Sequence, residues 1–397
     1  MKEDLKTRLR RYRDSGKSPE PAKPGHSKTG VSCLGKAAWA GWSEAGLCTL
    51  KRKITVGLDF PAPDVFPKAL AMLIPDLARL GKIPLPKELL FFDLETTGLS
   101  GGAGTLAFLA AFGRFPAQED KTQAGHFPAR FELNQYLLLD FPGEGDFVEK
   151  VVKEFGFFSP PVVVSYNGKC FDSLILKNRC LMNGIAVPEY HHADLLHPTR
   201  RLWKRKLPDC SQATVELSVL GLDRAGDVPG AFAPEAWFSF LRSGDPGGLL
   251  SVCDHNLKDV KGLACLFLAL AEIARDPFKG REKFKADEEA LALSYWITLK
   301  KYDRLFADDK ECLNTAKQLL QIAAENGHAK AAFTLFTSLA IEAEWRLKDP
   351  ALALHYTECA LALSEIPCGL INELERRRRR LEKKQEMTNA APARKYY

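Results

Sequence analysis

Residues 89–99 read LLFFDLETTGL, and this stretch decides the fold of the central part of the chain. Its apolar residues are typical of a buried strand. Asp93 and Glu95 are two residues apart, so a strand directs both side chains to one face of the sheet. Two carboxylates on one face repel each other unless a cation lies between them. Taken alone, the pair also fits a turn cap beside a solvent-exposed acid.

Two more strands are predicted directly after this one. The segment SGGAGT at 100–105 lacks the GK[ST] ending of a phosphate-binding loop, so it is predicted to form a tight hairpin turn. LAFLAAFGRF at 106–115 and FELNQYLLLD at 131–140 are both typical of strands. Three successive strands with short links predict an antiparallel meander.

Helices and strands alternate in the next part of the chain. A helix is predicted at 147–156, a β-branched strand at 161–167, a second helix at 173–184 and a fifth strand near 191–196. A long helical pattern follows at 251–274. Strands first and helix-linked strands afterwards predict a mixed five-stranded α/β sheet with flanking helices.

After Pro277 only helical patterns remain. Ala and Leu recur at helical spacing in 288–305, 314–345 and 350–363, joined by short breaks, and helix pairs of this length are typical of tetratricopeptide-like solenoids. The chain is therefore divided into four parts. They are a basic flexible leader (1–59), a sheet-containing domain (60–276), tetratricopeptide-like helical repeats (277–372) and a basic C-terminal tail (373–397).

The composition is that of a soluble globular protein, because 46% of the 397 residues are hydrophobic and 27% are charged. No apolar run reaches the roughly 18 residues of a membrane-spanning helix. The charged N-terminus is not followed by the apolar segment of a secretory signal. We therefore expect a cytoplasmic protein with no membrane partner. The ten cysteines are scattered without a CxxC pair, so we expect reduced thiols.

The net charge of +6 is concentrated at the two ends. Residues 1–30 and 373–397 each carry nine Lys or Arg against four Asp or Glu, which leaves −4 for the body between them. Basic ends suit contact with nucleic acid, but they also occur as solvated tails. The run Arg376–Arg380 has Glu residues on both sides, which favours a charged terminal helix over a binding arm.

Three more polar residues follow the carboxylate pair in order. YNGKCFD at 166–172 brings Asp172 to the start of a helix, where an Asp also serves as an N-cap. In HNLKD, His255 and Asp259 are four residues apart and so share one face of a helix. On its own such a pair is most often a surface hydrogen bond. The order and spacing of the whole set make a metal site the stronger interpretation.

The ordered set DLETTG, YNGKCFD and HNLKD resembles the DEDD (DnaQ-like) 3′-to-5′ exonuclease superfamily. A closer resemblance is to the bacterial YprB-type RNase H-like domain. The segments that carry it are LETTGLSGGAGTLAFL, FELNQYLLLDF, YNGKCFD, DLLHPTRRLWKRKLPDCSQATVE and HNLKDV. It covers roughly residues 85–275, about half of the chain, and the C-terminal helical repeats also fit that family. The resemblance implies that 60–276 is an RNase H-like exonuclease domain.

The resemblance further implies a nuclease acting on DNA or RNA, in which two Mg²⁺ or Mn²⁺ ions are bound and His255 activates the attacking water. The implied metal ligands are Asp93, Glu95, Asp172 and Asp259. Carboxylate oxygens are suitable ligands for these hard ions. Known DEDD families place a His five residues, or a Tyr four residues, before the last Asp. Here a His stands at the Tyr spacing, so whether His255 is the general base stays open.

Candidate nucleic-acid contacts lie in two segments. Asn167 either orients a water or nucleotide at the metals or only satisfies its turn, and Asp194 is either a fifth acidic group or a helix cap. In RRLWKRK at 200–206, cations surround an aromatic side chain, which suits a phosphate backbone with a stacked base. A solvated basic helix is the alternative there. The candidates in this segment are Arg200, Arg201, Trp203, Lys204, Arg205 and Lys206.

A second function class is a non-catalytic scaffold that keeps the RNase H-like fold. Such a protein would bind nucleic acid or a protein partner, with the helical repeats as the contact surface. The unusual position of His255 and the C-terminal helices are the features that support it.

Overall fold

The structure is a computed structural model, and it describes residues 39–61, 63–98, 104–116, 129–156, 160–307, 309–364, 366 and 368–390. The elements below belong to one compact unit that begins at Ala40. Residues 1–38 of the expected leader, and the hairpin turn expected at 100–105 up to residue 103, lie outside the described residues.

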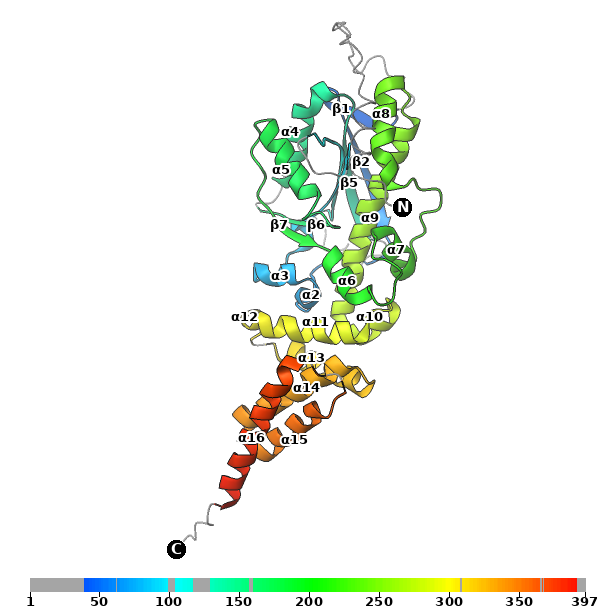
Figure 1. The fold of residues 1–397 in the computed structure, drawn as a ribbon. Coiled ribbons are helices and arrows are strands. Elements are labelled where there is room, and N and C mark those ends of the chain that lie inside the picture. Colours follow the sequence, from blue (N-terminus) through cyan, green and yellow to red (C-terminus); the bar gives the residue numbers. More distant parts are fainter. Residues whose placement is uncertain are drawn as a thin grey trace, which may run out of the picture. The chain divides into compact units, whose positions relative to one another are not determined.

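Seven strands form one mixed sheet (Figure 1). In spatial order they are β1 (Trp42–Gly46), β2 (Thr49–Leu58), β5 (Ala129–Leu138), β4 (Ala107–Arg114), β3 (Leu89–Thr96), β6 (Val162–Ser165) and β7 (His191–Asp194). Neighbouring strands are antiparallel from β1 to β3, whereas β6 and β7 continue the sheet parallel to β3. The predicted meander and the two helix-linked strands are confirmed.

The strands β1 and β2 are additional to the five expected. They come from residues that the sequence pattern assigns to the leader over 1–59, so the ordered region begins earlier than expected. Strand β2 pairs with β5 along its whole length, from Thr49 opposite Leu138 to Leu58 opposite Ala129. Its central residues are Lys, Arg and Lys, and their long side chains obscure the alternation of a strand.

Helices cover both faces of the sheet (Figure 1). On one face lie α4 (Glu144–Phe155) and α5 (Asp172–Met182), and on the other α8 (Ala233–Ser243) and α9 (Gly247–Arg275). The ring of Phe92 in β3 contacts Phe155 of α4, with centroids 5.4 Å apart, whereas the ring of Phe91 contacts Phe267 of α9 at 5.8 Å. Because strand side chains alternate, the odd-numbered residues of β3 face α9.

Helix α9 lies close to the sheet because β4 carries small residues where they meet. A Cβ atom added to Gly113 would lie 2.8 Å from Val260 Cγ1 of α9 and 2.3 Å from Phe131 Cζ of β5. Both approaches are too short for a larger residue to fit without a shift. Because Gly113 has no side chain, the polar turns of α9 pack directly against β3 and β4.

The remaining helices of the described residues follow in chain order. They are α2 (Leu70–Leu73), α3 (Pro75–Leu80), α6 (Leu196–Trp203), α7 (Gln212–Val215), a π-helix (Glu216–Leu220), α10 (Pro277–Lys283), α11 (Glu288–Lys301), α12 (Asp303–Phe306), α13 (Lys310–Glu325), α14 (Ala329–Glu342), a second π-helix (Ala343–Leu347), α15 (Pro350–Leu361) and α16 (Cys368–Ala390). Short 3₁₀ turns lie at Pro86–Glu88, Phe141–Gly143 and Gly230–Phe232. Within the described ranges, no helix has the length and apolarity to cross a membrane.

The C-terminal helices pack in succession, as α11 against α13, α13 against α14, α14 against α15 and α15 against α16. Helix α11 also belongs to the main hydrophobic core, because Tyr295 is fully buried there and Thr298 Oγ1 donates to the carbonyl of Met72 at 3.3 Å. Helix α16 includes most of the residues assigned to the basic tail at 373–397. Leu381 is buried, and Arg380 and Lys384 pair with Glu344.

Candidate metal-binding site

The two carboxylates of β3 face α9, as the alternation of the strand requires. Asp93 Oδ2 accepts a hydrogen bond from Asn256 Nδ2 at 2.7 Å. Asn256 is fully buried and in turn accepts from Gln135 Nε2 at 2.9 Å, and Gln135 accepts from Arg52 Nη2 at 2.7 Å. A chain of hydrogen bonds thus runs from Arg52 of β2 through β5 and α9 to Asp93 and fixes its carboxylate.

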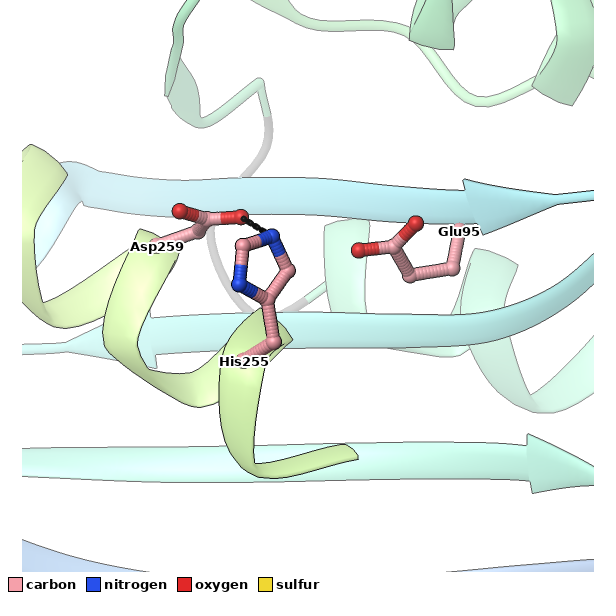
Figure 2. A group of neighbouring side chains, drawn as sticks. All are labelled: Glu95, His255 and Asp259. Carbon is pink, nitrogen blue, oxygen red and sulfur yellow. Dashed lines mark ion pairs between the residues drawn. The ribbon is translucent and has the colours of Figure 1, made fainter. Parts of the chain in front are cut away.

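Glu95, His255 and Asp259 lie together beside this chain (Figure 2). One ligand atom of each lies within 4.8 Å of the others. His255 Nε2 is 3.2 Å from Asp259 Oδ2, one turn further along α9. The strand residue and the two helix residues therefore meet at one point between β3 and α9.

Asp172 completes the acidic set from a different element. It is 5% exposed at the start of α5, just after β6, and accepts a backbone hydrogen bond from Leu94 of β3. An added Cβ on Gly168 would lie 2.9 Å from Asp172 Oδ2, so the glycine lets the turn pass close to this carboxylate. All four carboxylates expected from the sequence are thus brought together.

The electrostatics of the four carboxylates show that they share one environment. Burial raises the pKa of Asp93 well above its usual range, and Asp259, Asp172 and Glu95 raise it further. Burial, together with Asp259 and Asp172, raises the pKa of Glu95 to about 8. Burial also raises the pKa of Asp172 to about 7, with contributions from Asp194 and Asp259. Clustered, buried carboxylates that resist ionisation are suitable ligands for a divalent cation, which relieves the repulsion.

Asp194 and Asn167 form the turn that carries Asp172. The carboxylate of Asp194 accepts from the backbone N–H groups of Asn167 at 2.8 Å, Lys169 at 3.1 Å and Leu196 at 3.1 Å. Asn167 has a φ of +64°, a left-handed conformation that asparagine tolerates. Asp194 therefore fixes the turn before Asp172, although the N-cap residue of α6 is Leu195, and Asn167 forms part of the same turn.

The basic segment at 200–206 differs from the expected base-stacking surface. Trp203 is fully buried and its Nε1 donates to the carbonyl of Phe284 at 2.8 Å, so it has no face for a base. Arg205 pairs with Asp287 at 2.6 Å and Glu289 at 2.9 Å, which ties α6 to α11. The other four candidates are exposed: Arg200, Arg201, Lys204 and Lys206.

A loop between the first π-helix and α8 contributes two residues that the sequence did not reveal. Asp227 Oδ2 lies 2.8 Å from His255 Nδ1, and Asp227 Oδ1 lies 3.1 Å from Lys258 Nζ. Arg224 Nη1 lies 2.5 Å from Asp259 Oδ1. The loop has no periodicity or known motif, so neither contact could be predicted from the sequence.

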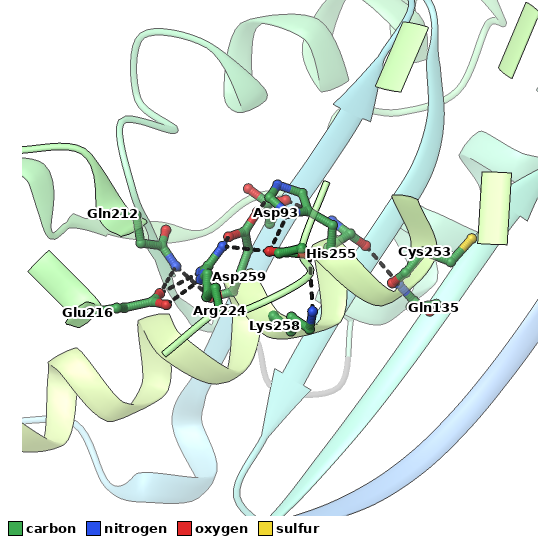
Figure 3. A network of polar contacts seen from close by, with 11 residues as sticks. Asp93, Gln135, Gln212, Glu216, Arg224, Cys253, His255, Lys258 and Asp259 are labelled. Carbon is green, nitrogen blue, oxygen red and sulfur yellow. Dashed lines mark hydrogen bonds and ion pairs between the residues drawn. The ribbon is translucent and has the colours of Figure 1, made fainter. Parts of the chain in front are cut away.

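Glu216 anchors Arg224 in this position (Figure 3). Its carboxylate is 2% exposed and binds the Arg224 guanidinium twice, at 2.6 and 2.7 Å. Gln212 Nε2 donates both to Glu216 Oε1 at 2.8 Å and to the carbonyl of Asp259 at 2.7 Å. Gly262 of α9 leaves the space, because an added Cβ would lie 1.8 Å from Glu216 Oε1. Only one nitrogen of Arg224 therefore faces the acidic cluster.

Two of the compared proteins are solved structures with low sequence identity. A family B DNA polymerase from the archaeon Pyrobaculum calidifontis is 17% identical, with a TM-score of 0.35, over 54% of this chain and 29% of the polymerase. The zinc-bound E. coli ExoI–ssDNA complex is 15% identical, with a TM-score of 0.30, over 48% of this chain and 41% of ExoI.

Residues 90–271 match the model of an RNase H superfamily family. The uncharacterized protein YprB of Bacillus subtilis is 33% identical over 265 residues, which are 66% of this chain and 58% of YprB. The chain therefore spans less than two thirds of that relative. Over residues 90–271 the chain is therefore similar to the RNase H superfamily, and over 265 residues it is similar to YprB.

Proposed function

We propose that the protein is a metal-dependent nuclease, a 3′-to-5′ exonuclease that hydrolyses phosphodiester bonds of DNA or RNA. The observation that carries the proposal is the convergence of four acidic residues from β3, α5 and α9 beside His255. The pKa values of Asp93, Glu95 and Asp172 are raised by burial and by neighbouring carboxylates, which is typical of functional sites. The RNase H superfamily match supports this class of activity.

Asp93, Glu95, Asp172 and Asp259 would hold two Mg²⁺ or Mn²⁺ ions. These ions, when bound, would lower the pKa of an attacking water and offset charge on the leaving oxygen. The donor set fits them, because it consists of one buried and three half-buried carboxylates with Asn256 and His255 at its edge. Asn256 would keep one oxygen of Asp93 fixed and so orient the other one.

His255 is the residue that would accept the proton of the attacking water. Asp227 accepts a hydrogen bond from Nδ1, so the proton of the neutral ring lies on Nδ1 and Nε2 points toward the acidic cluster. A His that Asp227 orients through Nδ1, with Nε2 directed at the acidic cluster beside Asp259, is placed for general-base catalysis. We therefore propose that the pairing with Asp227 compensates for the unusual sequence spacing of His255.

The exposed cations of α6 and the segment after it would contact the phosphate backbone. Arg200, Lys204 and Lys206 are exposed, and Asn167 lies on the turn before Asp172. Phosphate contacts of this kind position a strand without reading its sequence. The helices after Pro277, which we propose to be tetratricopeptide-like repeats, would provide a surface for a protein partner.

Hydrolysis of an oligonucleotide tests the proposal. A strand labelled at its 5′ end should be shortened from its 3′ end in the presence of Mn²⁺ or Mg²⁺, giving a ladder of labelled products. The variant D93N should lose the activity. D254N is the matched control, because Asp254 lies on α9 but is exposed and pairs with Arg52. Equal hydrolysis by D93N and the unaltered protein would refute the proposal.

One observation favours the second function class, a non-catalytic scaffold. Asp259 is contacted by both Arg224 and His255, so its charge is compensated by groups of the protein itself. A scaffold of this kind would bind a nucleic-acid strand without cutting it at any concentration of divalent cation. Its affinity for the strand would also be the same in D93N.

A further inference from the structure

We propose that a basic pocket between α6 and α11 is an accessory site for the phosphates of a single nucleic-acid strand. The proposal rests on the proposed nuclease function and extends it away from the acidic cluster. The pocket has a volume of about 470 Å³, within the usual range for ligand sites. Its cationic residues are Arg79, Arg201, Arg205, Lys301 and Lys330, and its acidic residue is Glu289.

Three of these cations have no acidic partner among the residues that the structure describes. Glu289 is occupied by Arg205 at 2.9 Å and by the backbone N–H of Lys330 at 3.1 Å. In the part of the chain that the structure describes, the side chains of Arg201, Lys301 and Lys330 form no ion pair. An excess of unpaired positive charge around a concave surface attracts an anion.

The walls of the pocket are fixed in place. Trp203 and Arg205 connect the end of α6 to Phe284, Asp287 and Glu289, and α11 packs in the main core. Leu293 and Ile297 of α11 form an apolar side, with Ile297 58% exposed. Cations beside an exposed apolar wall suit a sugar–phosphate backbone whose sugars and bases pack against the apolar side chains.

The pocket is linked to the turn that carries Asp172. Arg79 Nη1 lies 2.8 Å from Asp76 Oδ1, and Asp76 Oδ2 lies 2.6 Å from Lys169 Nζ. Lys169 belongs to the YNGKCFD turn, three residues before Asp172. Two salt bridges through Asp76 therefore connect the turn before Asp172 to the wall of the pocket.

Binding of a fluorescent 20-nucleotide single strand, followed by anisotropy, tests the inference. The variant K301E/K330E changes two exposed side chains that lie outside the acidic cluster. We expect roughly ten-fold weaker binding and a smaller slope of log affinity against log salt, by about 0.7 for each lost phosphate contact on a single strand. The control K150E/K177E makes the same charge change on α4 and α5 and should leave both quantities as in the unaltered protein.

A trinucleotide substrate separates this inference from the proposed function. A trinucleotide bound at the acidic cluster offers few phosphates to a second site, so all these variants should hydrolyse it at the same rate. Absence of trinucleotide hydrolysis in the unaltered protein would contradict the nuclease function and leave the strand-binding result to be judged separately. Circular dichroism should show that both variants are folded. Equal strand affinity of K301E/K330E and K150E/K177E would then overturn the proposal that the pocket binds the strand. Tighter binding of an acidic peptide than of the strand at this pocket would overturn the proposal as well.

Discussion

Asp227 Oδ2 lies 2.8 Å from Nδ1 of His255, although the two residues are 28 positions apart and belong to a loop and a helix. On the other side of the ring, Nε2 lies 3.2 Å from Asp259 Oδ2. Asp227 thereby sets the orientation of a side chain whose position in the sequence does not reveal its role. This relationship gives the first prediction.

In D227N, the His255 ring loses a charged acceptor and its preferred tautomer. Loss of a partner that orients a functional His typically lowers metal affinity or activity by 10- to 100-fold. We therefore expect kcat for oligonucleotide hydrolysis to fall by roughly that factor, with a smaller change in KM and a shifted pH profile. K258M is the control, because Lys258 contacts Asp227 but not His255. A D227N enzyme with the kcat and pH profile of K258M would show that Asp227 does not act through His255.

G262A should lower stability, although replacing glycine by alanine inside a helix ordinarily stabilises it by about 1 kcal/mol. The added Cβ would lie 1.8 Å from Glu216 Oε1, so it must displace the carboxylate that holds Arg224. We expect a loss of about 1 to 3 kcal/mol in the free energy of unfolding, the range for overpacking a core. Urea denaturation measures it.

G248A provides the matched comparison, since Gly248 lies in the first turn of the same helix. A Cβ there would meet Phe232 Cζ at 3.6 Å, an ordinary contact. G248A should be neutral or slightly stabilising. If G262A were as stable as G248A, the close packing of Glu216 against α9 would be wrong.

The buried ring of His192 should make the stability of the protein fall in mild acid, where an unfolded His becomes protonated. Burial lowers the pKa of His192 to about 4, and its ring contacts Ser165 Oγ at 2.7 Å and Ser173 Oγ at 3.2 Å. An unfolded His has a pKa near 6.5, so the unfolded state binds the proton first as the pH falls. The stabilisation is complete above about pH 6.5 and is lost between pH 6.5 and 4, to a total of about 3 kcal/mol.

The variant H192Q lacks the titrating ring, so its unfolding free energy should fall less between pH 7 and pH 4.5. Chemical denaturation of both proteins at the two pH values measures the difference. Identical pH dependence in both would mean that His192 is as easily protonated in the folded state as in the unfolded one.

The central strands and the order of the acidic residues could be predicted because each depends on local patterns. Strand β3 is an uninterrupted apolar run that ends in alternating acids, and β6 is strongly β-branched. The i, i+4 pair of His255 and Asp259 follows from helical periodicity alone. The structure places these residues where the patterns indicated.

The parts that could not be predicted depend on tertiary contacts. Strand β2 carries three consecutive cations, and only its pairing with β5 reveals it as a strand. Trp203 stands among basic residues in the sequence, but helical geometry turns it into the core with Leu202. Arg224 and Asp227 reach the site from a loop whose course is set by Glu216 and α9.

Titration with Mn²⁺ at pH 7.5, followed by electron paramagnetic resonance of the free ion, tests the central claim most directly. We expect two bound ions in the unaltered protein and in D254N. In D93N and in D172N, which remove ligands contributed by β3 and α5, we expect weaker binding and fewer ions. The metal site would be contradicted if the folded, unaltered protein failed to bind Mn²⁺, or if D93N and D254N bound it equally.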